Sequence, residues 1–279
     1  MQIKTILVYV PSEKSAAPTV ESVLKIAGTR SAHVIGLHLV PDLPVYGEFP
    51  AEVSQEVIER LQKAGSDAAA AAQRAFEAAF SLGHVTHEWR SFVASYIAGG
   101  DLIAQQGRSA DLIVCAKPAD DSPDAWSDFA ETALMRCGRP VLVLPGGTGA
   151  EHIGRHAVIA WNDTREAARA VFDSLDLLRE AETVRAVTVI DDEEERAAAE
   201  AYGTPLIAAL GRHGIRVSFE IAFASKGSTG ETILSKLAGG DCDLLVMGGY
   251  SKSRFREMIF GGVSRDILRE TWVPALLSH

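Results

Sequence analysis

The residues whose types and spacing are best suited to chemistry lie in one stretch, residues 243–265, with the sequence DLLVMGGYSKSRFREMIFGGVSR. A short apolar run near its start predicts a buried strand. Two glycine pairs follow, separated by a polar loop with three cationic side chains, and the second pair opens a predicted helix. These residues are, in chain order, Gly248-Gly249, then Lys252, Arg254 and Arg256, and then Gly261-Gly262.

A strand, a glycine, a cationic loop and a glycine at a helix start together form a pattern that binds anions in α/β proteins. Glycine lets the backbone approach a ligand closely, and the unpaired amides of a helix N-terminus point at negative charge. An ordinary strand-to-helix turn with a solvated basic loop gives the same local pattern, because such turns are common. The residues alone leave both interpretations open.

The chain of 279 residues repeats itself, so the same elements must position two such regions. The run ADLIVCAKP at 110–118 parallels CDLLVMGGY at 242–250. A short glycine-rich segment, residues 145–154, separates the two copies. We therefore predict two domains of equal plan, over residues 1–147 and 154–279.

Strands alternate with helices in both halves, and several strands are apolar on both faces, which favours parallel sheets covered by helices on both sides. The carboxyl ends of the strands then meet at one edge, where ligands bind at the switch point of strand order. We expect Asp163 to cap the first helix of the second half, with Glu166 completing a capping box. The helix over 193–213 is expected to be interrupted near Gly203-Thr204-Pro205. The predicted strands span 3–10, 33–40, 85–92, 112–116, 141–144, 157–161, 184–190, 215–222, 244–247 and 274–277.

The composition is typical of a soluble globular protein, with 47% hydrophobic residues and a net charge of -10. That charge disfavours nucleic acid or an anionic membrane as a partner, and no apolar run is long enough to span a bilayer. The three cysteines lack metal or redox spacing, and Cys115 and Cys242 are expected to be buried structural thiols. No nucleophile motif or P-loop is present, so we expect neither catalysis nor a metal site.

The repeated pattern resembles the universal stress protein family in its tandem two-domain form. Nucleotide-binding members of that family carry a glycine, two residues, a glycine, nine residues, and then a glycine followed by serine or threonine. The second half keeps this spacing, with Ser251 in place of the second glycine and Gly262 in place of the hydroxyl residue. Asn162 stands where the family has an aspartate facing the ribose, and Val189 matches the residue whose backbone meets the adenine.

The resemblance implies two flavodoxin-like, Rossmann-like α/β domains packed as an internal pseudo-dimer. Each would hold a doubly wound five-stranded parallel sheet of the adenine nucleotide alpha hydrolase-like type. It also implies a site for ATP or another adenine nucleotide in the second domain, with Mg²⁺ as a candidate companion ion, and Ser264 could supply the missing hydroxyl. The expected site residues are Asn162, Asp163, Thr164, Val189, Gly248, Gly249, Ser251, Lys252, Gly261, Gly262, Val263 and Ser264.

The first half departs further from the family pattern. Pro11 stands in the place of the aspartate, and residues 116–118 replace the glycine pair. The loop at 119–125 carries three aspartates, which would repel phosphate. We therefore predict that the first domain binds no nucleotide and serves as a structural partner.

The family resemblance further implies a cytoplasmic stress-response protein that acts by nucleotide-linked regulation and not by turnover. A homodimer through the edges of the last strands, 141–144 and 274–277, and an unidentified regulatory protein partner are expected. Two alternatives stay open. The protein could be a scaffold or dimerisation protein with a vestigial second site, or a weak ATPase, which would need a base or metal ligand that the sequence does not identify.

Overall fold

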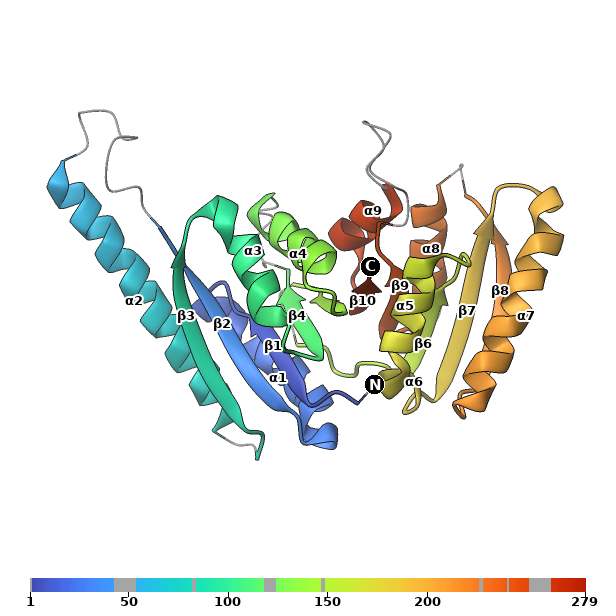
Figure 1. The fold of residues 1–279 in the computed structure, drawn as a ribbon, viewed down its shortest axis with the longest axis horizontal. Coiled ribbons are helices and arrows are strands. Elements are labelled where there is room, and N and C mark those ends of the chain that lie inside the picture. Colours follow the sequence, from blue (N-terminus) through green and yellow to red (C-terminus); the bar gives the residue numbers. More distant parts are fainter. Residues whose placement is uncertain are drawn as a thin grey trace. The chain divides into compact units, whose positions relative to one another are not determined.

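The computed structural model divides into two compact units (Figure 1). The first-half unit comprises Lys4–Cys137 and Gly146–Gly149, and the second-half unit comprises Met1–Ile3, Gly138–Pro145 and Ala150–His279. The segment Gly138–Pro145 therefore packs with the second half, although the sequence repeat places it in the first. The structure describes residues 2–42, 54–81, 84–117, 124–146, 149–225, 228–239, 241–250 and 262–279.

The first-half unit contains a parallel sheet with the strand order β3-β2-β1-β4. Helix α1 packs along α2, and α3 packs along α4. The α1–α2 pair covers one face of the sheet and the α3–α4 pair covers the other (Figure 1). The elements are β1 (Thr5–Tyr9), α1 (Glu13–Arg30), β2 (His33–Pro41), α2 (Gln55–Phe80), β3 (His87–Ala94), α3 (Tyr96–Gly107), β4 (Leu112–Ala116) and α4 (Asp124–Arg136).

The second-half unit has the strand order β5-β10-β9-β6-β7-β8, parallel throughout except where β5 meets β10. The middle residues of β6 and the first four residues of β9 are buried, as their two-sided apolar sequences predict. The elements are β5 (Val141–Leu144), β6 (His156–Ala160), α5 (Arg165–Asp173), α6 (Leu175–Leu178), β7 (Thr183–Ile190), η1 (Glu193–Glu195), α7 (Arg196–Arg212), β8 (Val217–Phe223), α8 (Thr229–Ala238), β9 (Leu244–Gly248), α9 (Gly262–Glu270) and β10 (Ala275–Ser278).

The last strands of the two sequence halves pair with each other inside one chain. Strand β5 runs antiparallel to β10, with Val141 opposite Leu277 and Val143 opposite Ala275. Because β10 has β9 on its other side, both of its edges are occupied. The sequence-based expectation that these strands pair across a homodimer therefore needs correction, since the apolar edges are already covered within the chain.

The start of α5 differs from the predicted capping box. Asp163 has a φ of 52°, in the left-handed region, and Thr164 is the N-cap, whose hydroxyl oxygen accepts a hydrogen bond from Ala167 N. Glu166 is buried and forms an ion pair with Arg165. The prediction that Asp163 caps this helix is therefore wrong, because the chain turns sharply at that residue before the helix begins.

Helix α7 runs without a break through Pro205, so the predicted interruption near Gly203 is also wrong. A Cβ atom on Gly203 would lie only 2.4 Å from the Phe219 ring, so the glycine lets the helix pack closely on β8. Leu206 and Leu210 are buried on the same helix. Tertiary packing outweighs the poor local helix propensity of glycine and proline here.

The buried thiol of Cys115 provides a first test of the core. Burial, followed by the nearby Cys137, raises the pKa of the Cys115 thiol to about 12, and the side chain has no exposed surface. The thiolate is the reactive form, so we expect a disulfide reagent at pH 8 to label Cys115 only as fast as the protein unfolds. Peptide mass spectrometry after timed labelling would measure this. Labelling as fast as in an unfolded control would contradict the packing of β4.

The sequence expectation for the other strand thiol holds only in part, because Cys242 is only partly buried. No helix among the described residues combines the length and apolar character needed to cross a membrane.

Candidate functional site

The switch point of the second-half sheet lies between β6 and β9. These strands are parallel neighbours, with Ala160 opposite Met247. The chain leaves β6 toward β7 on one side, and β9 lies on the other, so the connections diverge here. This divergence brings the turn after β6, with Asn162, to the same edge as Gly248 at the end of β9, where ligands bind in open α/β sheets.

Gly248 is required by packing against α5. A Cβ atom at this position would lie 2.5 Å from Ala167 N and 2.6 Å from the carbonyl carbon of Glu166. No side chain can be accommodated there without movement of the backbone. The first predicted glycine is therefore explained by the fold alone, whether or not a ligand is bound.

The backbone after Gly248 is held by the C-terminal part of the chain. Gly249 N donates to Ser278 O at 2.8 Å, and its carbonyl oxygen lies 3.1 Å from His279 Nδ1. Tyr250 has a φ of 54°, and its amide donates to Ser264 Oγ at 3.1 Å. Ser264 is buried, and its hydroxyl oxygen anchors Tyr250 at the start of the loop.

The N-terminus of α9 supplies the amide groups of the candidate site. Gly262 is exposed, and Val263 is partly exposed, at the first turn of this helix. First-turn amides have no partner within a helix and carry partial positive charge. The carboxylate of Asp266 also lies here, with Oδ2 3.7 Å from the position that a Cβ on Gly262 would occupy. Its negative charge would repel an anion bound at this helix end.

The turn after β6 presents Asn162 at the edge of the sheet. Thr164 Oγ1 donates to Asn162 Oδ1 at 2.8 Å, so the oxygen of the amide is engaged and its nitrogen remains the donor. Val189 lies near the end of β7, opposite Ala222 of β8 and two residues beyond Val187, which pairs with Ala160. Its backbone therefore reaches the same edge as Asn162.

Part of the predicted site lies outside the described residues. Ser251, Lys252, Gly261, Arg254 and Arg256 all fall in this part of the chain. The structure thus brings together Asn162, Gly248 and the start of α9. Among the residues that the structure describes, no group of three His, Cys, Asp or Glu side chains is placed to hold a metal ion.

The first-half unit has aromatic rings at the corresponding end of β1. Tyr9 is buried, and its ring meets that of Phe129 edge-to-face at a centroid distance of 5.8 Å. A Cβ on Gly99 would also touch the Phe129 ring. Residues 118–123, with most of the predicted acidic loop, lie outside the described residues, and the absence of nucleotide binding by this unit stays a prediction.

Sequence reasoning missed a group of side chains between α5 and α7. Thr188 Oγ1 donates to Trp161 O at 2.9 Å, and the side chain of Tyr202 lies beside Thr188. Burial, followed by the charges of Glu195 and Asp163, raises the pKa of Tyr202. The sequence feature that could have indicated this group is Trp161, which directly follows β6. A single aromatic residue after a strand is too common to predict a site.

Comparisons with known proteins support the fold. Residues 155–279 match the family model described as Universal stress protein family. The chain is similar to the crystal structure of a universal stress protein from Archaeoglobus fulgidus, with a TM-score of 0.71, 14% identity, and coverage of 98% of this chain and 95% of that chain. It is also similar to a functionally unknown protein from Pseudomonas aeruginosa, with a TM-score of 0.60, 14% identity, and coverage of 99% and 92%.

A third similar structure is the cytoplasmic domain of a prokaryotic cation chloride cotransporter, with a TM-score of 0.52, 12% identity, and coverage of 99% and 96%. At these identities the likeness establishes the fold, and it does so for both halves of the chain. No curated protein sequence matches the chain.

Proposed function

Because residues 155–279 form a universal stress protein domain, we propose that this domain binds an adenine nucleotide, ATP or a relative, as a regulatory ligand that it does not turn over. The observation that supports the proposal is the meeting of Asn162, Gly248 and the N-terminus of α9 at the switch point of the sheet. This edge offers a side-chain donor and a helix N-terminus within one site, which suits a ribose and a phosphate chain.

Each part of the nucleotide has a proposed partner. The phosphates would lie over the first turn of α9, where Gly262 has no side chain to block them. The Asn162 amide nitrogen would donate to a ribose hydroxyl, and the backbone of Val189 would meet the adenine. A Mg²⁺ ion would arrive with the phosphates, as this ion usually does, and would offset the charge of Asp266.

Calorimetry with ATP and with ADP tests the proposal directly. We expect measurable heat and a nucleotide-dependent rise in the melting temperature, because a ligand that binds only the folded state stabilises it. Mass spectrometry of small molecules carried through purification would identify the natural nucleotide. The absence of both heat and thermal shift at millimolar nucleotide would reject binding.

Gly262→Asp separates nucleotide binding from folding. Gly262 is exposed, and among the described residues only Asp266 comes within 4 Å of an added Cβ. The helix dipole favours a carboxylate at this position and Asp266 opposes it, so we expect the variant to fold with nearly unchanged stability. The same carboxylate would repel the phosphates, and we expect ATP affinity to fall by about tenfold or more. Calorimetry and thermal melting would measure both effects. Gly262→Ala is the matched control and should keep ATP affinity, while equal affinities of the two variants would contradict the phosphate position.

The scaffold alternative is favoured by a different observation. Packing explains Gly248, and the backbone groups of Gly249 and Tyr250 are bonded within the protein, so this segment is complete without a ligand. In that case ATP would raise the melting temperature of neither the unmodified protein nor Gly262→Asp, and neither protein would bind nucleotide in a titration.

For both candidate functions we propose that the protein is cytoplasmic and acts on a regulatory partner protein that is still to be identified. A homodimer would need a surface other than β10.

A further inference from the structure

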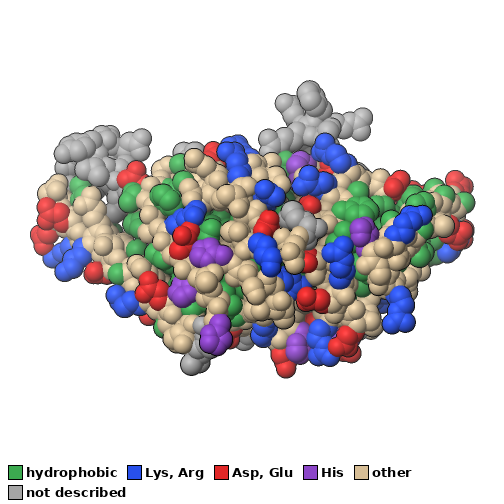
Figure 2. Space-filling model, turned by 60° about the horizontal axis from the view of Figure 1, so that its bottom comes forward, with side chains coloured by type: hydrophobic (Ala, Val, Ile, Leu, Met, Phe, Trp, Pro, Cys, Tyr) green, Lys and Arg blue, Asp and Glu red, His purple; other side chains and the backbone are tan. Residues whose placement is uncertain are grey.

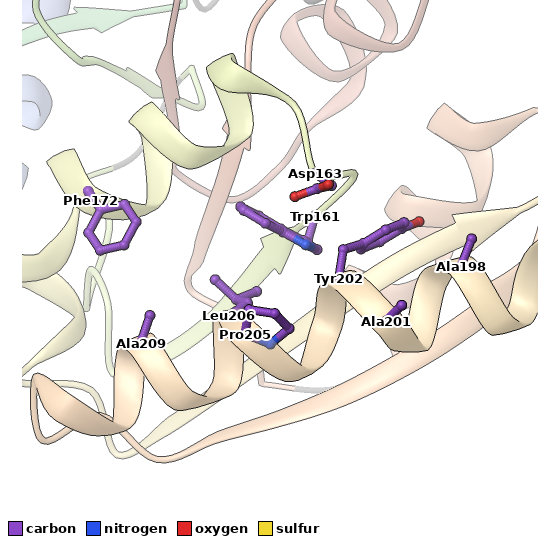
Figure 3. Close-up of a pocket in the computed structure, with 9 residues that line it drawn as sticks. All are labelled: Trp161, Asp163, Phe172, Ala198, Ala201, Tyr202, Pro205, Leu206 and Ala209. Carbon is purple, nitrogen blue, oxygen red and sulfur yellow. The ribbon is translucent and has the colours of Figure 1, made fainter.

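The two helices on one face of the second-half sheet leave a groove between them. In the first-half unit, α1 has 18 residues and packs along α2. Its counterpart α5 has 9 residues and is followed directly by the one-turn helix α6. Helix α5 lies over β9 and β10, whereas α7 lies over β8. The strip between α5 and α7 is therefore not closed by helix packing, and Figure 3 shows the side chains that line it.

The groove has the size and lining of a small-molecule site. Its volume is about 560 Å³, within the range of about 300–1,000 Å³ that is usual for ligand pockets. Trp161, Phe172, Tyr202 and Leu206 supply most of its apolar wall, and Phe172 is 41% exposed. Three alanines of α7 widen the groove on the opposite side; they are Ala198, Ala201 and Ala209.

Trp161 carries a buried donor without an acceptor. Its side chain is 7% exposed, and its Nε1 atom has no hydrogen-bond partner among the described residues. Figure 3 shows the nitrogen edge of the indole facing Tyr202 across the groove. The residue is fixed at its backbone, because its amide donates to Val187 O and its carbonyl oxygen accepts from Thr188 Oγ1, both at 2.9 Å. An unsatisfied buried donor is costly, so an incoming acceptor would recover that cost.

The charge around the groove selects among ligands. Asp163 is the one charged residue of the described lining, and the carboxylate of Glu195 also acts on Tyr202 at the mouth. Both charges are negative, so they disfavour an anionic ligand. The flat aromatic walls favour a planar apolar molecule.

We propose that this groove binds a neutral, planar aromatic molecule with one hydrogen-bond acceptor, to which Trp161 Nε1 donates once Tyr202 turns aside. Tyr202 is partly exposed, and a rotamer change of such a side chain is fast and inexpensive. The groove shares Asp163 with the expected nucleotide site, but its other lining residues are not among those expected to bind nucleotide, and its test uses no nucleotide. The inference therefore does not depend on nucleotide binding.

Three naphthalene probes test the proposal: 1-acetonaphthone has an acceptor, 1-ethylnaphthalene has a similar shape without one, and 1-naphthoate is an anion. The readout is the indole N–H resonance of Trp161 in a ¹H–¹⁵N spectrum, assigned by its loss in Trp161→Phe. We expect 1-acetonaphthone to move this resonance downfield and saturably, and 1-ethylnaphthalene to bind about tenfold more weakly, as one lost hydrogen bond predicts. We expect 1-naphthoate to bind more weakly than the ketone.

Two pairs of variants complete the test. Ala201→Leu fills the groove and should abolish the shift, whereas Ala197→Leu, on the same helix but outside the lining, should leave it unchanged. Because Trp161→Phe removes the reporting resonance, calorimetry measures this pair: Trp161→Phe should weaken 1-acetonaphthone about tenfold, and Trp272→Phe, at a residue that is 50% exposed, should not. Equal binding of the ketone and the hydrocarbon, or unchanged binding by Ala201→Leu, would overturn the proposal. A Trp161 shift that depends on protein concentration alone would overturn it in favour of a second copy of the chain.

Discussion

Replacing Asp243 by alanine is expected to lower the free energy of unfolding of the second-half unit by about 3 kcal/mol. The carboxylate accepts three backbone hydrogen bonds at the start of β6: Oδ1 from Gly154 N at 3.0 Å and His156 N at 2.9 Å, and Oδ2 from Arg155 N at 3.1 Å. Alanine leaves all three amides without their acceptor, and water can compensate only the exposed part. Urea unfolding followed by circular dichroism would measure the loss.

The repeat provides a comparison for this prediction. Asp111 is the equivalent residue of the first half, and its Oδ2 accepts from Lys4 N at 2.8 Å and Thr5 N at 2.9 Å. Because two amides are involved and not three, Asp111→Ala should cost less than Asp243→Ala. Asp241→Ala changes an exposed acid two residues away and should stay within about 0.5 kcal/mol of the unmodified protein. An Asp243→Ala protein as stable as the Asp241→Ala protein would show that β6 does not need this carboxylate.

Gly248→Ala is expected to cost about 3 kcal/mol of stability, near the upper end for overpacking, because the added Cβ meets backbone atoms and not a movable side chain. The two contacts, at 2.5 Å to Ala167 N and 2.6 Å to the carbonyl carbon of Glu166, force β9 and α5 apart. Thermal or urea unfolding would record the loss. A loss of ATP affinity in this variant would then reflect the fold, so Gly262 is the better position for testing the ligand.

The control for this variant changes a glycine with free space around it. Gly211 lies in α7 with no heavy atom within 4 Å of an added Cβ. Gly211→Ala should therefore raise stability by up to about 1 kcal/mol through helix propensity. The two substitutions are chemically identical and should have effects of opposite sign. A neutral Gly248→Ala would mean that the close approach of β9 to α5 does not exist in solution.

Much of the fold could be predicted because its strands are apolar on both faces. The predicted strands at 112–116 and 141–144 coincide with β4 and β5, and the repeat correctly indicates two copies of one plan. The errors arose where local rules met tertiary packing. Asp163 is drawn into a left-handed turn, and Gly203 is retained in α7 for its contact with Phe219. Neither effect can be derived from residue types at short range.

The candidate site was predictable only where strand order determines it. Asn162 and Gly248 follow neighbouring strands, so parallel topology alone brings them to one edge. The bond between Tyr250 N and Ser264 Oγ depends on how the chain returns from α9, and the sequence does not reveal this. The groove beside Trp161 was not predictable either, because it depends on α5 lying over β9 and β10 while α7 lies over β8.

The placement of β5 beside β10 has a consequence for dissecting the protein. The glycine-rich linker resembles a domain boundary at which the chain could be truncated. A truncation there would remove Gly138–Pro145 from the second-half unit, to which this segment contributes strand β5. A fragment starting at the linker would expose the bare hydrogen-bonding edge of β10, a template on which other chains can assemble. Halves separated at the linker would therefore not reproduce the structure of the intact chain. A fragment of the second-half unit should begin before Gly138.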